Sequence, residues 1–140
     1  MKNYVCFLIV LILSSCDAPV DQNTSFDYSI DQSIGCFCTF SGELVRLFVK
    51  ADTIADAIIL ADNSRLAYER WSTYKTIKGL YNDISNIDTS VFDVVVTIDT
   101  VHNFPSLFYF NPKPMIHGDT VIRVYDAQMS YTTKNYNKLK

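Results

Sequence analysis

Two cysteines separated by one residue, Cys36 and Cys38, are the side chains of this sequence with the clearest potential for chemistry. In a regular β-strand, side chains at i and i+2 share a face about 6.6–6.8 Å apart. A disulfide instead needs Cβ atoms about 3.5–4.5 Å apart, so a bond requires a bend, which the preceding Gly35 favours. Three interpretations stay open. We expect a local disulfide that closes a tight loop. The alternatives are two reduced thiols packed beneath the helix and a pair of metal ligands.

The sequence has too few suitable ligands for a metal site at the two cysteines. A zinc site would need two more, and the sequence offers only His102 and His117, neither with metal-like spacing to the cysteines. We therefore expect no metal and no cofactor. Asp99 with His102 could form an acid–base pair only if the fold brought them into contact. Because the nucleophile elbow, the His-Glu-x-x-His motif and the glycine-rich phosphate loop are all missing from the sequence, we expect no catalytic residues.

The first sixteen residues follow the pattern of a bacterial lipoprotein signal. Lys2 supplies a positive charge, and residues 5–13 form an unbroken apolar run. This run is shorter than the roughly 20 residues that cross a bilayer, but it suits the apolar core of a secretory signal. Leu13-Ser14-Ser15-Cys16 follows and resembles the lipobox, in which the cysteine thiol receives diacylglycerol and the leader is cut just before it. Cys16 is therefore the predicted lipidation site.

Cleavage before Cys16 divides the chain into a signal peptide, residues 1–15, and a mature protein. Residues 16–25 are polar and without periodicity, which is typical of a flexible tether. Acyl chains on Cys16 would anchor the protein to a membrane of the bacterial cell envelope, on its periplasmic or cell-surface side. That compartment is oxidising, so a disulfide is permitted.

The charge of the mature chain bears on its partners. Without Lys2 it has 11 basic residues against 15 acidic ones, a net charge of −4. Because the Lys and Arg residues form no cluster that could neutralise phosphates, we exclude nucleic acid as a partner. Residues 132–140 hold three of the lysines, and we interpret them as a polar tail. Residues 26–131 then form a single domain.

Hydrophobic periodicity predicts an α+β domain. Alternating apolar and polar residues predict strands at 26–31, 36–40, 44–49, 54–60, 92–99, 107–111 and 119–130. Apolar residues spaced by three or four predict one amphipathic helix over 74–87, with Ser72, Thr73 or Thr76 as its N-cap. One helix cannot supply the crossovers of a parallel sheet. We therefore expect an antiparallel sheet of about six to seven strands with one helix packed on one face, in the order ββββ-α-βββ.

Aromatic residues suggest a binding surface. The chain contains nine Tyr and nine Phe, more than a thin two-layer core needs. In the stretch Phe-Pro-Ser-Leu-Phe-Tyr-Phe, alternation places Phe108 and Phe110 on one face and Leu107 and Tyr109 on the other. A sheet side that the helix leaves uncovered would carry some of these aromatic residues, and we expect a binding face that includes Phe108, Tyr109 and Phe110. An exposed aromatic face suits an envelope protein or an apolar ligand. A loop, the tether or a second molecule could cover it instead.

Three stretches, "CFCTFSGELVRLFVKADTIADAIILAD", "TIKGLYNDI" and "FDVVVTIDTVHNFPSLFYF", resemble a family of small secreted proteins known as domain of unknown function 6174. The resemblance covers residues 26–130. Asn103-Phe104 departs from the Gly-Tyr usual in the family, and His117-Gly118-Asp119 replaces a more acidic stretch. The resemblance implies the fold and an extracytoplasmic address, but no activity. The matching positions are Cys36, Cys38, Thr76, Ile77, Leu80, Asp99 and Pro105.

These observations predict a membrane-anchored extracytoplasmic lipoprotein that acts as a binding or interaction module. The alternative is a thiol–disulfide redox protein that uses Cys36 and Cys38. Redox enzymes of this kind lower the pKa of a thiol at a helix N-terminus, whereas a strand is predicted around these two residues.

Overall fold

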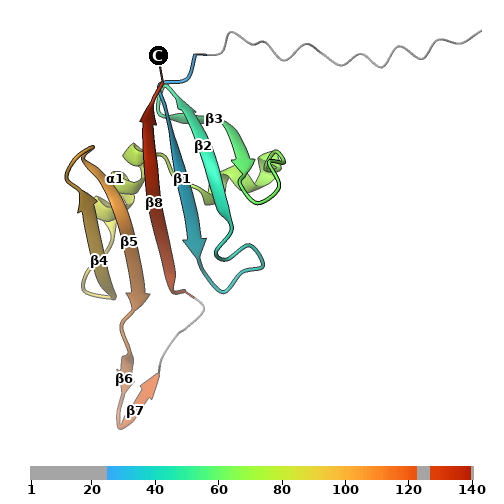
Figure 1. Ribbon diagram of the computed structural model, residues 1–140. Helices are drawn as coiled ribbons and strands as arrows, with labels where there is room; N and C mark the ends of the chain where they lie inside the picture. Colours follow the sequence, from blue (N-terminus) through green and yellow to red (C-terminus); the bar gives the residue numbers. More distant parts are fainter. Residues whose placement is uncertain (1–24, 123–126, 140) are drawn as a thin grey trace, which may run out of the picture.

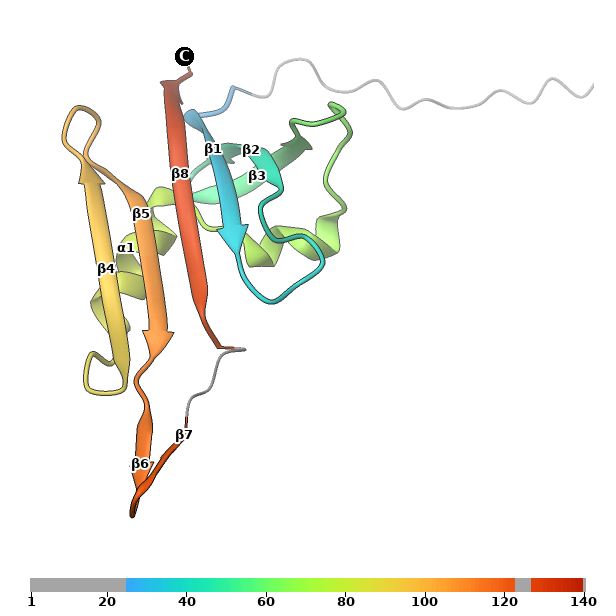
Figure 2. The ribbon, with the colours of Figure 1, turned by 60° about the horizontal axis from the view of Figure 1, so that its bottom comes forward.

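A computed structural model describes residues 25–122 and 127–139 of the chain. Its main element is a six-stranded antiparallel sheet with the strand order β3-β2-β1-β8-β5-β4 (Figure 1). A short hairpin, β6–β7, continues from β5 and projects beyond the sheet (Figures 1 and 2). The strands are β1 (Tyr28–Gly35), β2 (Leu44–Lys50), β3 (Thr53–Ile59), β4 (Phe92–Asp99), β5 (Phe104–Pro112), β6 (Met115–His117), β7 (Thr120–Ile122) and β8 (Met129–Lys138).

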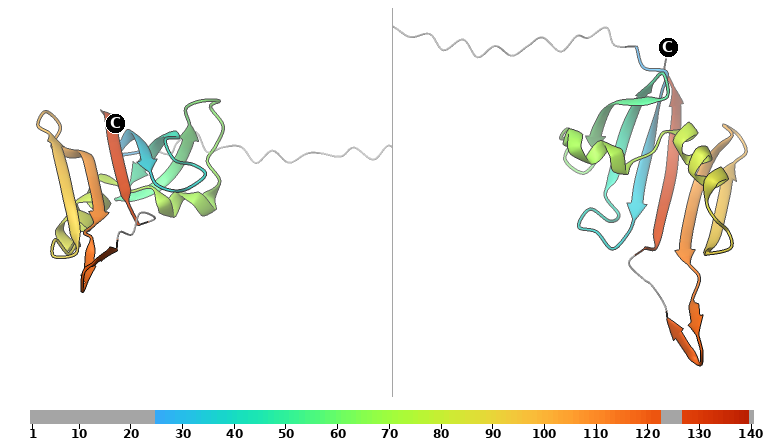
Figure 3. Two further views of the ribbon diagram at one scale, coloured as in Figure 1. Left: turned by 90° about the horizontal axis from the view of Figure 1, so that it is seen from below. Right: turned by 180° about the vertical axis from the view of Figure 1, so that it is seen from behind.

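Both described helices lie on one side of the sheet. The 3₁₀ helix η1 (Tyr68–Thr73) lies over the β1–β3 half, and α1 (Ile77–Asn86) lies over β5 and β4 (Figure 3, right). The opposite side carries no described helix (Figure 1). Neither η1 nor α1 is long and apolar enough to cross a membrane. The expected antiparallel sheet with helical structure on one face is confirmed. The expected order ββββ-α-βββ is wrong, because the described elements follow the order βββ-η-α-βββββ, with a 3₁₀ helix and a separate two-stranded hairpin besides the main sheet.

The helix side of the sheet contains the core. Leu80 of α1 is fully buried, and Ile77 and Ile84 pack against the same cluster, as the helical spacing predicts. Thr76 caps the helix, since its hydroxyl accepts a hydrogen bond from the Gly79 N–H at 3.0 Å. The helix therefore begins three residues later than predicted. The strands add a cluster of buried apolar side chains: Ile30, Ile34, Val45, Leu47, Val49, Ala57, Phe108 and Tyr131.

The predicted polar tail is wrong for residues 132–138, which belong to β8. This strand is central, because it pairs with β1 on one side and with β5 on the other. Tyr131 and Thr133 are buried, whereas Thr132 and Lys134 between and beside them are exposed. A strand with one solvated face exposes polar residues at alternate positions, and this made a central strand resemble a hydrophilic end.

Two other predicted strands also differ. Residues 36–40, expected as a strand, form turns between β1 and β2. The predicted strand at 119–130 is not one strand, because it includes β7, the non-strand residues 127–128 and the first two residues of β8. Its residues 123–126 lie outside the described part of the chain. Pro105 was expected before its strand but lies inside β5. Its position beside the register shift between Thr97 and Ile98 explains why a residue without an N–H is tolerated there.

Candidate functional site: an aromatic groove beside the cysteine loop

Cys36 and Cys38 lie in the loop between β1 and β2, and their sulfur atoms are adjacent, with the Cα atoms 5.2 Å apart. This separation falls within the 4.4–6.8 Å range of disulfides. The bend that a disulfide between these residues requires is present. Gly42 donates its N–H to the Ile34 carbonyl at 2.8 Å and so closes the loop. Phe37, between the cysteines, is 73% exposed. Residues 36–43 are called the cysteine loop below.

The aromatic residues of β5 do not share one face. Phe108 is buried and stacks on Tyr131, with ring centroids 6.2 Å apart, and Phe110 packs against the same core. Tyr109 is paired with Ser130 of β8 and Val95 of β4, and it points to the opposite side because side chains alternate along a strand. The expected binding face therefore does not form as a unit. Phe108 and Phe110 serve the core, and only Tyr109 faces the open side.

Cys16 lies outside the described residues, and so the structure does not place the expected lipidation site.

His102 lies near Asp99, with Nδ1 3.5 Å from Oδ1. The same carboxylate accepts the backbone N–H groups of Val101 and His102 at 2.9 Å each, and these bonds favour a pKa below the ordinary value for Asp99. Asp99 thus acts as a turn residue. Within the described ranges, no group of three His, Cys, Asp or Glu side chains could hold a metal ion.

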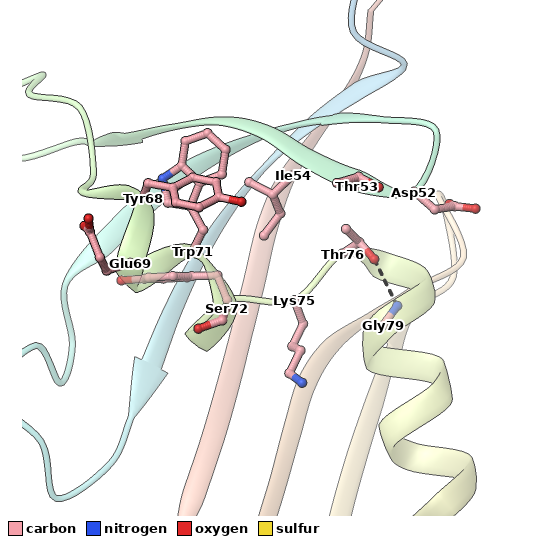
Figure 4. Close-up of a pocket in the computed structure, with 11 residues that line it drawn as sticks. Asp52, Thr53, Ile54, Tyr68, Glu69, Trp71, Ser72, Lys75, Thr76 and Gly79 are labelled. Atoms are coloured by element: carbon pink, nitrogen blue, oxygen red, sulfur yellow. Dashed lines mark hydrogen bonds between the residues drawn. The ribbon is translucent and has the colours of Figure 1, made fainter.

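A groove of about 500 Å³ lies between β3 and the segment that runs from η1 into α1 (Figure 4). Tyr68 and Trp71 of η1 form its aromatic wall, with ring centroids 5.0 Å apart. The Trp71 indole N–H donates to the Leu66 carbonyl at 3.0 Å and is thereby fixed in orientation. Tyr68 is 76% exposed. Ile54 points into the groove from β3 (Figure 4).

Polar groups surround this aromatic wall. Glu69 and Ser72 of η1 line the groove, and both are exposed. At the opposite end Asp52, in the β2–β3 turn, accepts a hydrogen bond from the Lys78 ammonium at 3.0 Å and so ties the turn to α1. The groove therefore combines a rigid apolar centre with a polar rim. This is the arrangement in which binding residues of protein interfaces are most often found.

Gln32 of β1 holds the floor of the groove in place. Its side-chain carbonyl accepts the Lys75 N–H at 2.8 Å, and its amide donates to the Lys75 carbonyl at 3.1 Å and to the Thr133 hydroxyl at 3.2 Å. Gln32 is fully buried. It satisfies both backbone groups of Lys75 where the chain is neither helix nor strand. Sequence reasoning missed Gln32, although it continues the inward positions of Tyr28 and Ile30 and precedes Ile34.

A second polar cluster joins η1 to the cysteine loop. Arg70 of η1 forms an ion pair with Glu43 and lies over the Phe40 ring, with the guanidinium carbon 4.8 Å from the centroid. Tyr74 is buried beside this pair. Its burial, reinforced by the negative charge of Glu43, raises the pKa of its hydroxyl. The wall of the groove is therefore fixed to the loop that contains Cys36 and Cys38.

The other side of the same segment bounds a second hollow of about 400 Å³, beside the cysteine loop. Ser72 and Lys75 line both hollows. The second one is mainly apolar, with Phe40, Phe110 and Met129 in its wall. Tyr131 also lines it, and burial, together with the charge of Asp83, raises the pKa of Tyr131 to about 12. Its hydroxyl thus stays protonated at neutral pH.

Comparison with known proteins gives one result. No curated protein and no solved structure matches the chain. A family match covers residues 20–137, which include every described strand but the last residue of β8, and both described helices. The resemblance seen in the cysteine pair, the helix start and the β4–β5 stretch is thereby confirmed. The chain belongs to the family of unknown function DUF6174.

Proposed function

We propose that this protein is a lipid-anchored binding module of the bacterial cell envelope, and that the groove in Figure 4 is its partner site. The observation that carries the proposal is the aromatic wall of Tyr68 and Trp71, in which a hydrogen bond fixes the Trp71 indole and the packed Tyr68 ring is open to solvent. Exposed, pre-ordered Tyr and Trp side chains lose little entropy on binding and contribute strongly to protein interfaces. We therefore favour an envelope protein as the partner.

Anchoring through Cys16 supports the same function. A tethered domain meets membrane-associated partners at an effective concentration set by the length of the tether. Residues 16–25 supply such a tether between the lipidated cysteine and the start of the described domain. Catalysis on a freely diffusing substrate would gain nothing particular from this arrangement.

The anchor is tested by Cys16→Ala in the full-length chain. The substituted precursor should keep its leader and receive no lipid, and this is measured by its mass and by labelling with radioactive palmitate. A protein that is still cleaved and still fractionates with membranes would show that Cys16 is not the anchor.

The partner site is tested by photocrosslinking in intact cells. Benzoylphenylalanine in place of Tyr68 should give a discrete adduct with an envelope protein. The control places the same group at Ile116, which is 77% exposed in the β6–β7 hairpin and does not line the groove, and it should give no such adduct. Equal labelling from both positions, or none from Tyr68, contradicts the proposed site.

The same crosslinking experiment distinguishes the binding module from the alternative function, a thiol–disulfide redox protein. A redox protein that exchanges disulfides through Cys36 or Cys38 would form mixed disulfides, which dithiothreitol releases and which require no light. Adducts of that kind, lost on Cys36→Ser, would favour the thiol–disulfide function over the binding module.

A further inference from the structure

The two edge strands of the six-stranded sheet, β3 and β4, differ in how far other segments of the chain cover them. The edge strand β3 is covered by its own chain, because Ile59 donates its N–H to the Ser64 carbonyl at 2.8 Å, and Leu66 donates to the Ala57 carbonyl at 2.9 Å. The Asp56 carboxylate accepts the Ala57 N–H at 3.0 Å. Edge strands protected in this way do not pair with other chains. The β3 edge is therefore closed at residues 57–59.

The other edge strand, β4, is open. In the described part of the chain its only strand partner is β5. At its start, the Asp88 carbonyl of the preceding turn accepts the Phe92 N–H at 3.0 Å. No described segment runs along the outer side of the rest of β4 (Figures 1 and 3). The register shift near Thr97 places the extra residue, Ser106, in β5 and leaves β4 regular. Outward backbone N–H and C=O groups of a regular edge strand are a template for another strand.

The side chains of β4 suit such pairing. Val95 is 49% exposed and Val96 is 36% exposed, on opposite faces of the strand. The strand contains no lysine or proline that would discourage pairing. Its sequence, Phe-Asp-Val-Val-Val-Thr-Ile-Asp, is rich in the β-branched residues that stabilise sheets. The edge therefore has both the backbone and the side chains of an interface.

We propose that β4 pairs antiparallel with the β4 of a second copy of this chain, so that the two sheets become one continuous sheet. The register centred on Val95 is self-complementary. It places Val95 opposite itself, Val94 opposite Val96, and Asp93 opposite Thr97, with the two members of each pair on the same face. Centring on Val96 would instead set Asp93 against Asp99, and like charges directly opposite each other destabilise a sheet.

The remaining structure permits this pairing. α1 lies over β5 and β4 on one side of the sheet, and not in line with the outer edge of β4 (Figure 3, right). Because the two β4 strands run in opposite directions, the two expected tethers start at opposite ends of the joined sheet. Ten extended residues span at most about 35 Å, so both anchors could reach one membrane along which the sheet lies flat.

A cysteine scan of β4 tests the pairing in membranes that contain the full-length chain. Residues that face each other across an antiparallel pair have Cα atoms about 4.5–5.5 Å apart, within the range of a disulfide. Val95→Cys should therefore give a covalent dimer on mild oxidation. Thr97→Cys alone should not, because its expected partner is Asp93, but it should crosslink when coexpressed with Asp93→Cys. The parent chain controls for the native cysteines.

A charge at the edge gives a second measurement. Val95→Lys should leave folding unchanged, because the side chain is half exposed, and should raise the dissociation constant of the dimer about tenfold or more in sedimentation. The control, Ala55→Lys at an exposed position of the other edge strand, β3, should not change it. A monomeric parent chain, or a Val95→Cys variant that crosslinks to a different protein rather than to itself, would overturn the proposal.

Discussion

Arg46 of β2 donates two hydrogen bonds to the carboxylate of Asp31 across the adjacent strand β1, from Nε at 2.7 Å and from Nη2 at 3.0 Å. The pair lies on the side of the sheet that no described helix covers, yet Asp31 is only 1% exposed. Asn135 of β8 donates a third bond to the same carboxylate at 2.8 Å. A polar cluster thus joins three neighbouring strands on this side of the sheet.

Arg46→Met should lower the free energy of unfolding by about 2 kcal/mol at pH 7, because it leaves a buried carboxylate with one neutral partner. Urea denaturation measures the change. The control is Arg65→Met, which removes the more exposed pair with Asp56 and should cost less than about 1 kcal/mol. Equal losses in the two variants would mean that the Asp31 cluster has no special role.

The same cluster predicts a dependence on pH. Burial favours the neutral acid, but the hydrogen bonds from Arg46 and Asn135 outweigh it, and the pKa of Asp31 lies below its ordinary value. Its stabilisation is therefore fully present above the unfolded pKa of about 3.9 and is lost as the pH falls through the lower folded pKa. The stability gap between the parent and Arg46→Met should narrow below about pH 4. A gap that stays constant down to about pH 2 would contradict this assignment.

Gln32→Leu should destabilise the protein by about 2–4 kcal/mol, because the N–H and C=O groups of Lys75 lose their partner at the groove floor. The loss should be accompanied by weaker photocrosslinking from position 68. Gln128→Leu is the control, since Gln128 is half-buried and outside the groove, and it should change neither measurement. An unaffected crosslink in a destabilised Gln32→Leu protein would separate Gln32 from the shape of the groove.

Periodicity predicted most of the fold, because most strands have one apolar face. Ile30, Leu47 and Phe108 all alternate with polar or less buried neighbours, and their strands were found. β8 was missed because its inward residues are Tyr131 and Thr133, and such a pattern resembles a solvated segment. The groove was not predictable, since it depends on where η1 meets β3, and Tyr68 is separated from Ile54 by a loop whose path no local pattern specifies.

Leu80→Ala tests the docking of α1. Leu80 is fully buried at the centre of the helix face that contacts the sheet, and truncation should cost about 2–5 kcal/mol through lost transfer energy and a residual cavity. Ile116→Ala removes a side chain of the same size from a position that is 77% exposed in the β6–β7 hairpin, and should cost less than about 0.5 kcal/mol. A change in Leu80→Ala as small as that of the control would mean that α1 is not held by this face.

The cysteine pair gives a prediction that also decides between the two functions. If Cys36 and Cys38 are bonded after export, the mature protein has a mass two hydrogens lower than the reduced chain and no titratable thiol. A loop of this size removes little entropy from the unfolded chain, so replacing both cysteines with serine should cost only about 1–2 kcal/mol. The double variant should fold, because the bond from Gly42 to Ile34 and the contact of Arg70 with Phe40 still hold the loop.

A structural bridge should have a reduction potential below about −300 mV, whereas a catalytic pair should fall nearer −120 to −270 mV. A potential in the upper range, together with oxidative-refolding activity lost in Cys36→Ser, would replace the binding module with a thiol–disulfide enzyme.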